Sequence, residues 1–201
     1  MDHKRVFTLK VTIPIFAFLT VIAQFGCTKA YVDPNLPRVS YSELEQVQKP
    51  PSLKVSFQFQ TNGKYNKAAT KQVSTLVVKT LKDSKLFASV DLVKKPEKSN
   101  LDIVMNNVGD TSSAVRKGVA TGCTLGIAGS QVTDGYVFTS TYLAPDKEPV
   151  ILQYEHAIHT TIGAKKGPEG LKPVTLKKAI EDVTEQLVLN TLKDLQAGGY
   201  F

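Results

Sequence analysis

The chain has 201 residues, with 25 lysines and arginines against 18 acidic residues and a formal net charge of +7. This length is enough for one domain after removal of a leader. The lysines are scattered along the sequence, which is typical of a solvated basic surface, although such a surface would also suit an anionic membrane. We expect no nucleic acid, cofactor, metal ion or small-molecule substrate as a partner.

The N-terminus has the pattern of a secretory signal peptide, which we place at residues 1–26. Lys4, Arg5 and Lys10 are followed by the uncharged apolar run 11–26. A basic stretch followed by an apolar stretch is typical of export. The run is shorter than the roughly 20 apolar residues that cross a bilayer as a helix.

Cys27 follows this run directly. The pair Gly26-Cys27 resembles the end of a bacterial lipobox, in which the cysteine receives diacylglycerol. Gln24 and Phe25 depart from the lipobox, which usually has leucine and a small residue there. The resemblance implies a lipid anchor at Cys27 in the outer membrane, with the protein facing the periplasm.

Other N-terminal fates stay open. Signal cleavage after Ala23 or after Ala30 also fits the small-residue rule, and the apolar run could remain as an uncleaved anchor. If Cys27 stays a thiol, a disulfide with Cys123 becomes possible in an oxidising compartment. A lipidated Cys27 would instead leave Cys123 as a small buried apolar residue.

Residues 27–52 are predicted to form a lipidated N-terminus and a proline-rich tether. The segment contains Pro34, Pro37, Pro50 and Pro51 and has no sustained apolar period. It could equally dock along the domain as an N-terminal arm.

Residues 53–198 predict an α+β domain. Strands are expected at 53–60, 86–93, 101–108, 136–144 and 149–162, and helices at 64–85 and 175–196. This βαββ…ββα order indicates a two-layer sandwich, with a mixed or antiparallel sheet and the helices on one face. A glycine-rich apolar insertion is expected at 111–135.

The strand–helix pair LKVSFQFQ…KAATKQVSTLVVKTLKDSKLFASVDLV and the element order resemble small bacterial envelope lipoproteins. Their domain is similar to the N-terminal domain of the TolB translocation protein and to the periplasmic part of the curli-secretion lipoprotein. The resemblance covers roughly residues 53–196. It implies a role in assembly or binding within the envelope, with envelope proteins or further copies of the chain as partners.

The insertion is the candidate contact element. Its glycines at four-residue spacing would lie on one face of a helix and allow close approach of a partner or membrane. The candidate residues are Gly118, Gly122, Leu125, Gly126 and Ile127. The alternative is an apolar strand or turn packed beneath the last helix.

Signals for catalysis are few. His156 and His159 are three apart, so a strand would direct them to opposite faces, and no third metal ligand accompanies them. No serine or threonine lies in a nucleophile-elbow pattern. Lys165, Lys166 and Lys172 could touch phospholipid headgroups or simply be solvated.

The sequence thus predicts a non-catalytic outer-membrane lipoprotein that acts in an envelope complex. One alternative is a periplasmic module that binds a lipid or another apolar ligand, which a cavity between sheet and helices would favour. Another is an envelope hydrolase, which would need a serine, a histidine and an aspartate in one cleft. A closed core with an exposed apolar patch would favour the assembly role.

Overall fold

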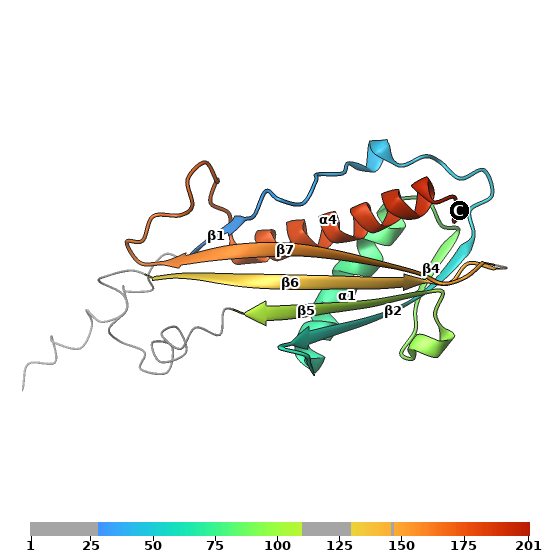
Figure 1. Ribbon diagram of the computed structural model, residues 1–201, viewed down its shortest axis with the longest axis horizontal. Coiled ribbons are helices and arrows are strands. Elements are labelled where there is room, and N and C mark those ends of the chain that lie inside the picture. The colour runs from blue at the N-terminus through green and yellow to red at the C-terminus, as the bar shows by residue number, and fades with distance from the viewer. Residues whose placement is uncertain (1–27, 110–129, 146) are drawn as a thin grey trace, which may run out of the picture.

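The computed structural model describes residues 28–109, 130–145 and 147–201 (Figure 1). They form a sheet in the order β1-β7-β6-β5-β2-β3, with β4 also paired to β2. The strands are β1 (Lys29–Val32), β2 (Ser52–Thr61), β3 (Lys64–Tyr65), β4 (Ser89–Leu92), β5 (Leu101–Gly109), β6 (Ser130–Tyr142) and β7 (Val150–Ile162). The helices are α1 (Lys67–Asp83) and α4 (Leu176–Ala197), with short 3₁₀ turns at Tyr41–Glu43 and Pro96–Lys98.

The predicted α+β fold is confirmed. The sheet is mixed: β2 runs parallel to β4 and β5, and the remaining pairs are antiparallel. Both helices pack on one face, and the sheet does not close on itself. The alternation in β2 accounts for this, because Leu53, Val55, Phe57 and Phe59 all point into the core beneath the helices.

Strand β6 begins earlier than the sequence predicts. Residues 130–135 belong to this strand and not to the insertion, since Ser130 pairs with Ile162 and the ladder continues to Tyr142 and Val150. Pairing along β7 supplies backbone hydrogen-bond partners for this stretch, which outweighs its weak local strand signal. Residues 111–129 of the predicted insertion lie outside the described residues.

Helix α4 supplies much of the core. Thr175 caps it by accepting a hydrogen bond from the backbone N–H of Lys178 at 3.2 Å. Val183, Leu187 and Leu195 lie on its apolar side and are buried. Within the described part of the chain, no helix is long and apolar enough to cross a membrane.

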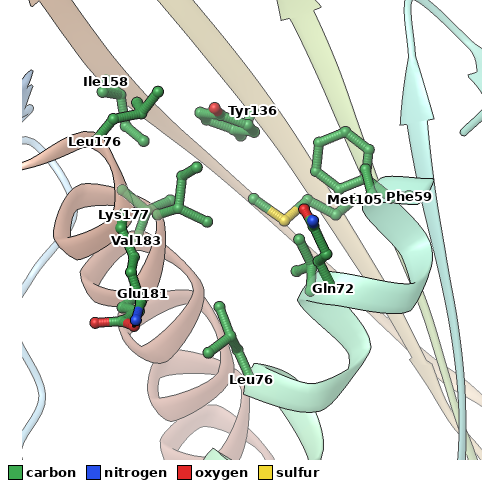
Figure 2. A pocket seen from close by; sticks show the side chains of 13 residues that line it. Phe59, Gln72, Leu76, Met105, Tyr136, Ile158, Leu176, Lys177, Glu181 and Val183 are labelled. Atoms are coloured by element: carbon green, nitrogen blue, oxygen red, sulfur yellow. The ribbon is translucent and has the colours of Figure 1, made fainter. Parts of the chain in front are cut away.

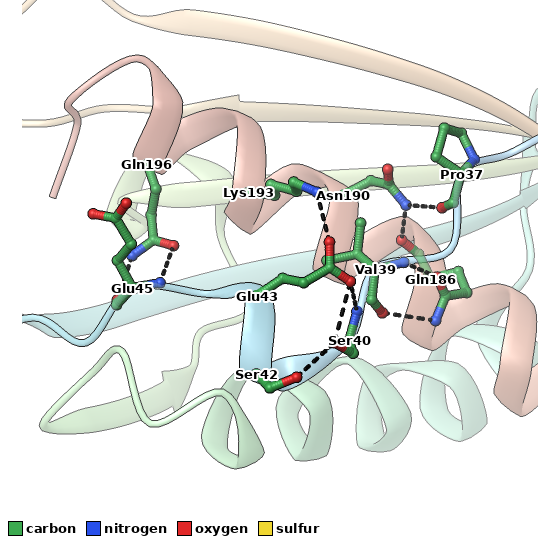
Figure 3. Close-up of polar contacts among 10 residues, drawn as sticks. All are labelled: Pro37, Val39, Ser40, Ser42, Glu43, Glu45, Gln186, Asn190, Lys193 and Gln196. Carbon is green, nitrogen blue, oxygen red and sulfur yellow. Dashed lines mark hydrogen bonds and ion pairs between the residues drawn. The ribbon is translucent and has the colours of Figure 1, made fainter.

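Residues 28–50 are not extended away from the domain. Residues 29–32 form β1 at the sheet edge, and the arm that follows lies along α4 (Figures 1 and 3). The side chain of Gln186 binds Val39 twice, accepting from its N–H at 2.8 Å and donating to its carbonyl at 3.2 Å. Asn190 donates to the carbonyl of Pro37 at 2.9 Å. Amide side chains of the helix therefore satisfy the arm's backbone much as a neighbouring strand would.

The arm is also held further along the helix. Gln196 accepts from the N–H of Glu45 at 3.1 Å and donates to its carbonyl at 2.6 Å. Lys193 contacts the Glu43 carboxylate at 2.8 Å, and this hydrogen bond, with those from Ser40, lowers the pKa of Glu43 to about 2. Glu43 therefore stays charged over the whole neutral and mildly acidic range.

Replacing Gln186 with methionine should loosen the arm, because the side chain keeps its length but loses both hydrogen bonds to Val39. We expect a loss of about 1–2 kcal/mol in the free energy of unfolding and faster proteolysis between residues 34 and 50. Denaturant unfolding of the purified chain measures the first effect. The matched control is Gln153→Met, which changes an exposed glutamine on β7. Equal stability of the two variants would contradict this role of Gln186.

Candidate functional site

The residues predicted to contact membrane or partner are not among those described. Cys27 precedes the first described residue, and Gly118, Gly122, Leu125, Gly126 and Ile127 fall between Gly109 and Ser130. The structure nevertheless fixes where these segments leave the domain. Both attach to one end of the sheet, where β2, β5 and β7 end and β1 and β6 begin (Figure 1). We call this the insertion end.

Strand β1 is firmly held at this end. Lys29 pairs with Thr161 of β7 on one side. On the other side Ala30 donates to the carbonyl of Val174 at 3.0 Å and accepts from its N–H at 2.8 Å. Ala30 itself is completely buried. The domain therefore begins only two residues after Cys27, and no flexible spacer separates the two.

Tyr31 packs against the loop that joins β7 to α4. A Cβ on Gly167 would overlap the ring of Tyr31 at its Cζ, so only glycine permits this approach. Tyr31 is buried by the contact. The loop and β1 thus fix each other.

An apolar pocket of about 530 Å³ lies between α1 and α4 above the sheet (Figure 2). Its floor comes from four strands, with Phe59, Met105, Tyr136 and Ile158. Its walls are the N-terminal halves of the two helices: Ala69, Gln72, Val73 and Leu76 from α1, and Leu176, Lys177, Ile180, Glu181 and Val183 from α4. The volume is within the range of small-molecule sites.

The pocket exists because the helices do not fill the space between their first turns. On α4, Leu176 and Ile180 continue the apolar stripe to the start of the helix, yet Leu176 is 43% exposed. Opposite them α1 carries Ala69 and Gln72, one too small and the other too polar to close the gap. Two residues on the apolar side of α4 therefore line an open pocket.

The pocket has few polar groups, and they lie at its rim and on its floor. Lys177 and Glu181 form an exposed ion pair at 3.9 Å at the rim. On the floor, burial raises the pKa of the Tyr136 hydroxyl, and the nearby Asp134 carboxylate raises it further. The hydroxyl therefore stays neutral, and the Tyr136 ring meets Phe59 edge-on at 6.4 Å. This arrangement suits an apolar ligand with one polar end.

Thr133 of β6, His159 of β7 and Asp33, which follows β1, form a separate row across the sheet. Nδ1 of His159 lies 2.9 Å from the Thr133 hydroxyl, and Nε2 lies 3.1 Å from the Asp33 carboxylate. The groups resemble those that a hydrolase requires. However, neither Thr133 nor His159 lines the neighbouring cavity, whose wall includes Asp33 and His156. We interpret the row as a clamp that holds the chain after β1 against β7.

The two histidines of β7 are separated as strand geometry predicts. His156 pairs with Tyr136, and His159 pairs with Thr133, so their side chains alternate between the faces of the sheet. Burial lowers the pKa of His156 and keeps it neutral near pH 7. Among the described residues, no three His, Cys, Asp or Glu side chains lie close enough to share a metal ion.

Substituting Gly167 by alanine should displace β1, because the new Cβ would overlap the Tyr31 ring. We expect a loss of about 1–3 kcal/mol in the free energy of unfolding. In a Tyr31→Ala background the same substitution should cost much less, since the ring is gone. A double-mutant cycle by denaturant unfolding measures the coupling. Additive effects would contradict the contact.

No protein-family model and no curated protein sequence matches the chain. Among solved structures it is similar to a PelC dodecamer from Paraburkholderia phytofirmans, with 10% identity, a TM-score of 0.36, and coverage of 85% of this chain and 98% of that one. A DUF330 protein from Xanthomonas campestris has 12% identity, a TM-score of 0.34, and coverage of 84% and 88%. A DUF4136 protein from Bacteroides thetaiotaomicron has 9% identity, a TM-score of 0.30, and coverage of 88% and 97%. At such identities and scores, the likeness concerns the fold alone.

Proposed function

We propose that the chain is a non-catalytic, lipid-anchored component of a bacterial cell envelope, held at the outer membrane with its domain facing the periplasm. The observation that carries this is the position of β1. Because Lys29 begins the strand two residues after Cys27, a lipid on Cys27 would hold the insertion end directly at the membrane.

The same strand bears on where the leader is removed. Cleavage after Ala30 would delete two of the four residues of β1, together with the hydrogen bonds between Ala30 and Val174. Cleavage before Cys27, or after Ala23, leaves the strand whole. The structure therefore favours these two sites over Ala30.

Such a component could act by contacting envelope proteins or by binding an apolar ligand. The pocket between α1 and α4 favours the second role, because a domain used only for contact has no need of a cavity of about 530 Å³ above its sheet. A single acyl chain suits its apolar floor, with the polar end of the ligand at the rim near Lys177. Assembly contacts remain the first alternative.

The lipid anchor predicts that Cys27→Ser abolishes incorporation of labelled palmitate in growing cells. The matched control is Cys123→Ser, which removes the other cysteine and should leave the labelling unchanged. The mass of the N-terminal peptide should correspond to a modified Cys27 with residues 1–26 removed. Labelling in neither the native chain nor the Cys123→Ser variant would overturn the proposal.

Ligand binding predicts that a photoreactive fatty acid fed to cells crosslinks to the pocket, on peptides containing Leu76, Met105 or Val183. Ala69→Phe should reduce this crosslinking by about tenfold, because the ring fills the space between the helices. The control is Ala88→Phe at an exposed position away from the pocket. Equal crosslinking in both variants would contradict the site, and a crosslink formed only by the chain's own Cys27 lipid would exclude a free ligand.

A further inference from the structure

The pocket between α1 and α4 lies next to the first strand of the domain. On one side of β1, Val32 pairs with Ile158, which is part of the pocket floor. On the other side Ala30 pairs with Val174, and α4 begins two residues later at Leu176, which is part of the pocket wall. Strand spacing and residue length place the Cα atoms of Ala30 and Leu176 within about 12 Å of each other. The pocket and the start of the domain are therefore neighbours.

The surface between β1 and the pocket is apolar. Ala30 and Val32 are two residues apart in the strand and so share one face of the sheet. It is the face of Ile158, which is paired directly with Val32. Ala30 is buried, Val32 and Val174 pack against the core, and Leu176 stands exposed at the mouth of the pocket. An apolar group that comes from the start of β1 would thus enter over apolar side chains.

An acyl chain on Cys27 has the reach to enter. Cys27 is three residues before Ala30, so their Cα atoms lie at most about 11 Å apart. An acyl chain spans half of a hydrocarbon core of roughly 30 Å, which adds about 15 Å. These two lengths together exceed the distance from Ala30 to the mouth. A group attached by so short a connection also has an effective concentration in about the millimolar range at the pocket.

We propose that one acyl chain of the Cys27 anchor occupies the pocket while the anchor is outside a bilayer, and leaves the pocket when the anchor inserts. The inference rests on the lipid at Cys27 proposed above. In water, burial in the pocket removes the apolar surface of the acyl chain from solvent. In a bilayer the surrounding hydrocarbon does the same, so the pocket offers no further gain. Insertion therefore opens the pocket to a free ligand.

The pocket limits how much of the anchor it can hold. Its volume of about 530 Å³ suits a single acyl chain, so the other chain of a diacylglyceryl group stays outside and is available to begin insertion. The rim also distinguishes the two occupants. A free fatty acid brings a carboxylate to Lys177, whereas a chain esterified in the anchor has no such charge to present.

Photocrosslinking of the full lipidated chain tests the proposal. Cells are fed a photoreactive fatty acid that enters the anchor, and the protein is purified in detergent to remove free lipid. One half is freed of detergent and the other is reconstituted into phosphatidylcholine vesicles before irradiation. The Cys27 peptide should become joined to peptides containing Leu76, Met105 or Val183, with a yield at least about fivefold higher in the absence of a bilayer.

Three variants check that the link forms in the pocket. Ala69→Phe should reduce it by about tenfold, because the ring fills the space between the helices, whereas Ala88→Phe should leave it unchanged. Lys177→Gln should also leave it unchanged, although it should weaken binding of an added free fatty acid by about threefold. Circular dichroism establishes that all three variants are folded.

Three results would overturn the proposal. One is a labelled anchor that forms no link to the pocket peptides without a bilayer, and another is an equal yield in vesicles. The third comes from mixing isotopically heavy and light copies, where links between copies would show that the pocket takes the anchor of a neighbouring molecule. Absence of the label from Cys27 would instead overturn the lipid anchor itself, so the two failures are distinguishable.

Discussion

Packing around α4 is the constraint on which the rest of the structure depends. The helix has sheet on one side and the N-terminal arm on another, so its middle turns are buried on more than one side, with Val183, Leu187 and Leu192 fully inaccessible. The polar residues Gln186 and Asn190 are placed where the arm passes, and they bind its backbone. A proline-rich segment with no apolar period is ordered in this way because a helix far along the chain supplies its partners.

The parts of the fold with a repeating pattern were predictable from the sequence. The alternation of 53–60 and the helical stripe of 175–196 both gave the correct element and the correct buried face. The arm and β1 were not predictable in the same way, because KAYV has no strand pattern of its own and its state comes from pairing with β7. Gln186 and Val39 are 147 residues apart, and no local signal joins them.

The pocket was missed for a related reason. Ala69 and Gln72 of α1 do not fill the space opposite Leu176 and Ile180 of α4. The apolar residues of one helix do not reveal which side chains of another helix will face them. The row of Thr133, His159 and Asp33 is likewise assembled from three separate strands or turns. The one available signal was Leu176, an apolar residue in the first turn of α4, where a helix end is usually solvated.

The two ends of the domain are built differently. Opposite the insertion end, Tyr142, Tyr200 and Phe201 stack edge-on at 5.8–6.3 Å, and Phe87 meets Phe201 at 5.4 Å. Aromatic side chains thus close the end opposite the insertion end. The pocket between α1 and α4 lies toward the insertion end. The pocket, the first strand and the exits of the chain therefore share one half of the molecule.

Because β1 starts so soon after Cys27, it also limits how far the domain could lie from a membrane anchor on Cys27. Two extended residues span about 7 Å, so a domain attached at Cys27 stays within one protein diameter of its bilayer. A domain anchored in this way would not bridge the periplasm to a component of the opposite membrane. A partner of the anchored domain would have to be embedded in the same membrane, be carried along its surface, or extend far enough to reach it.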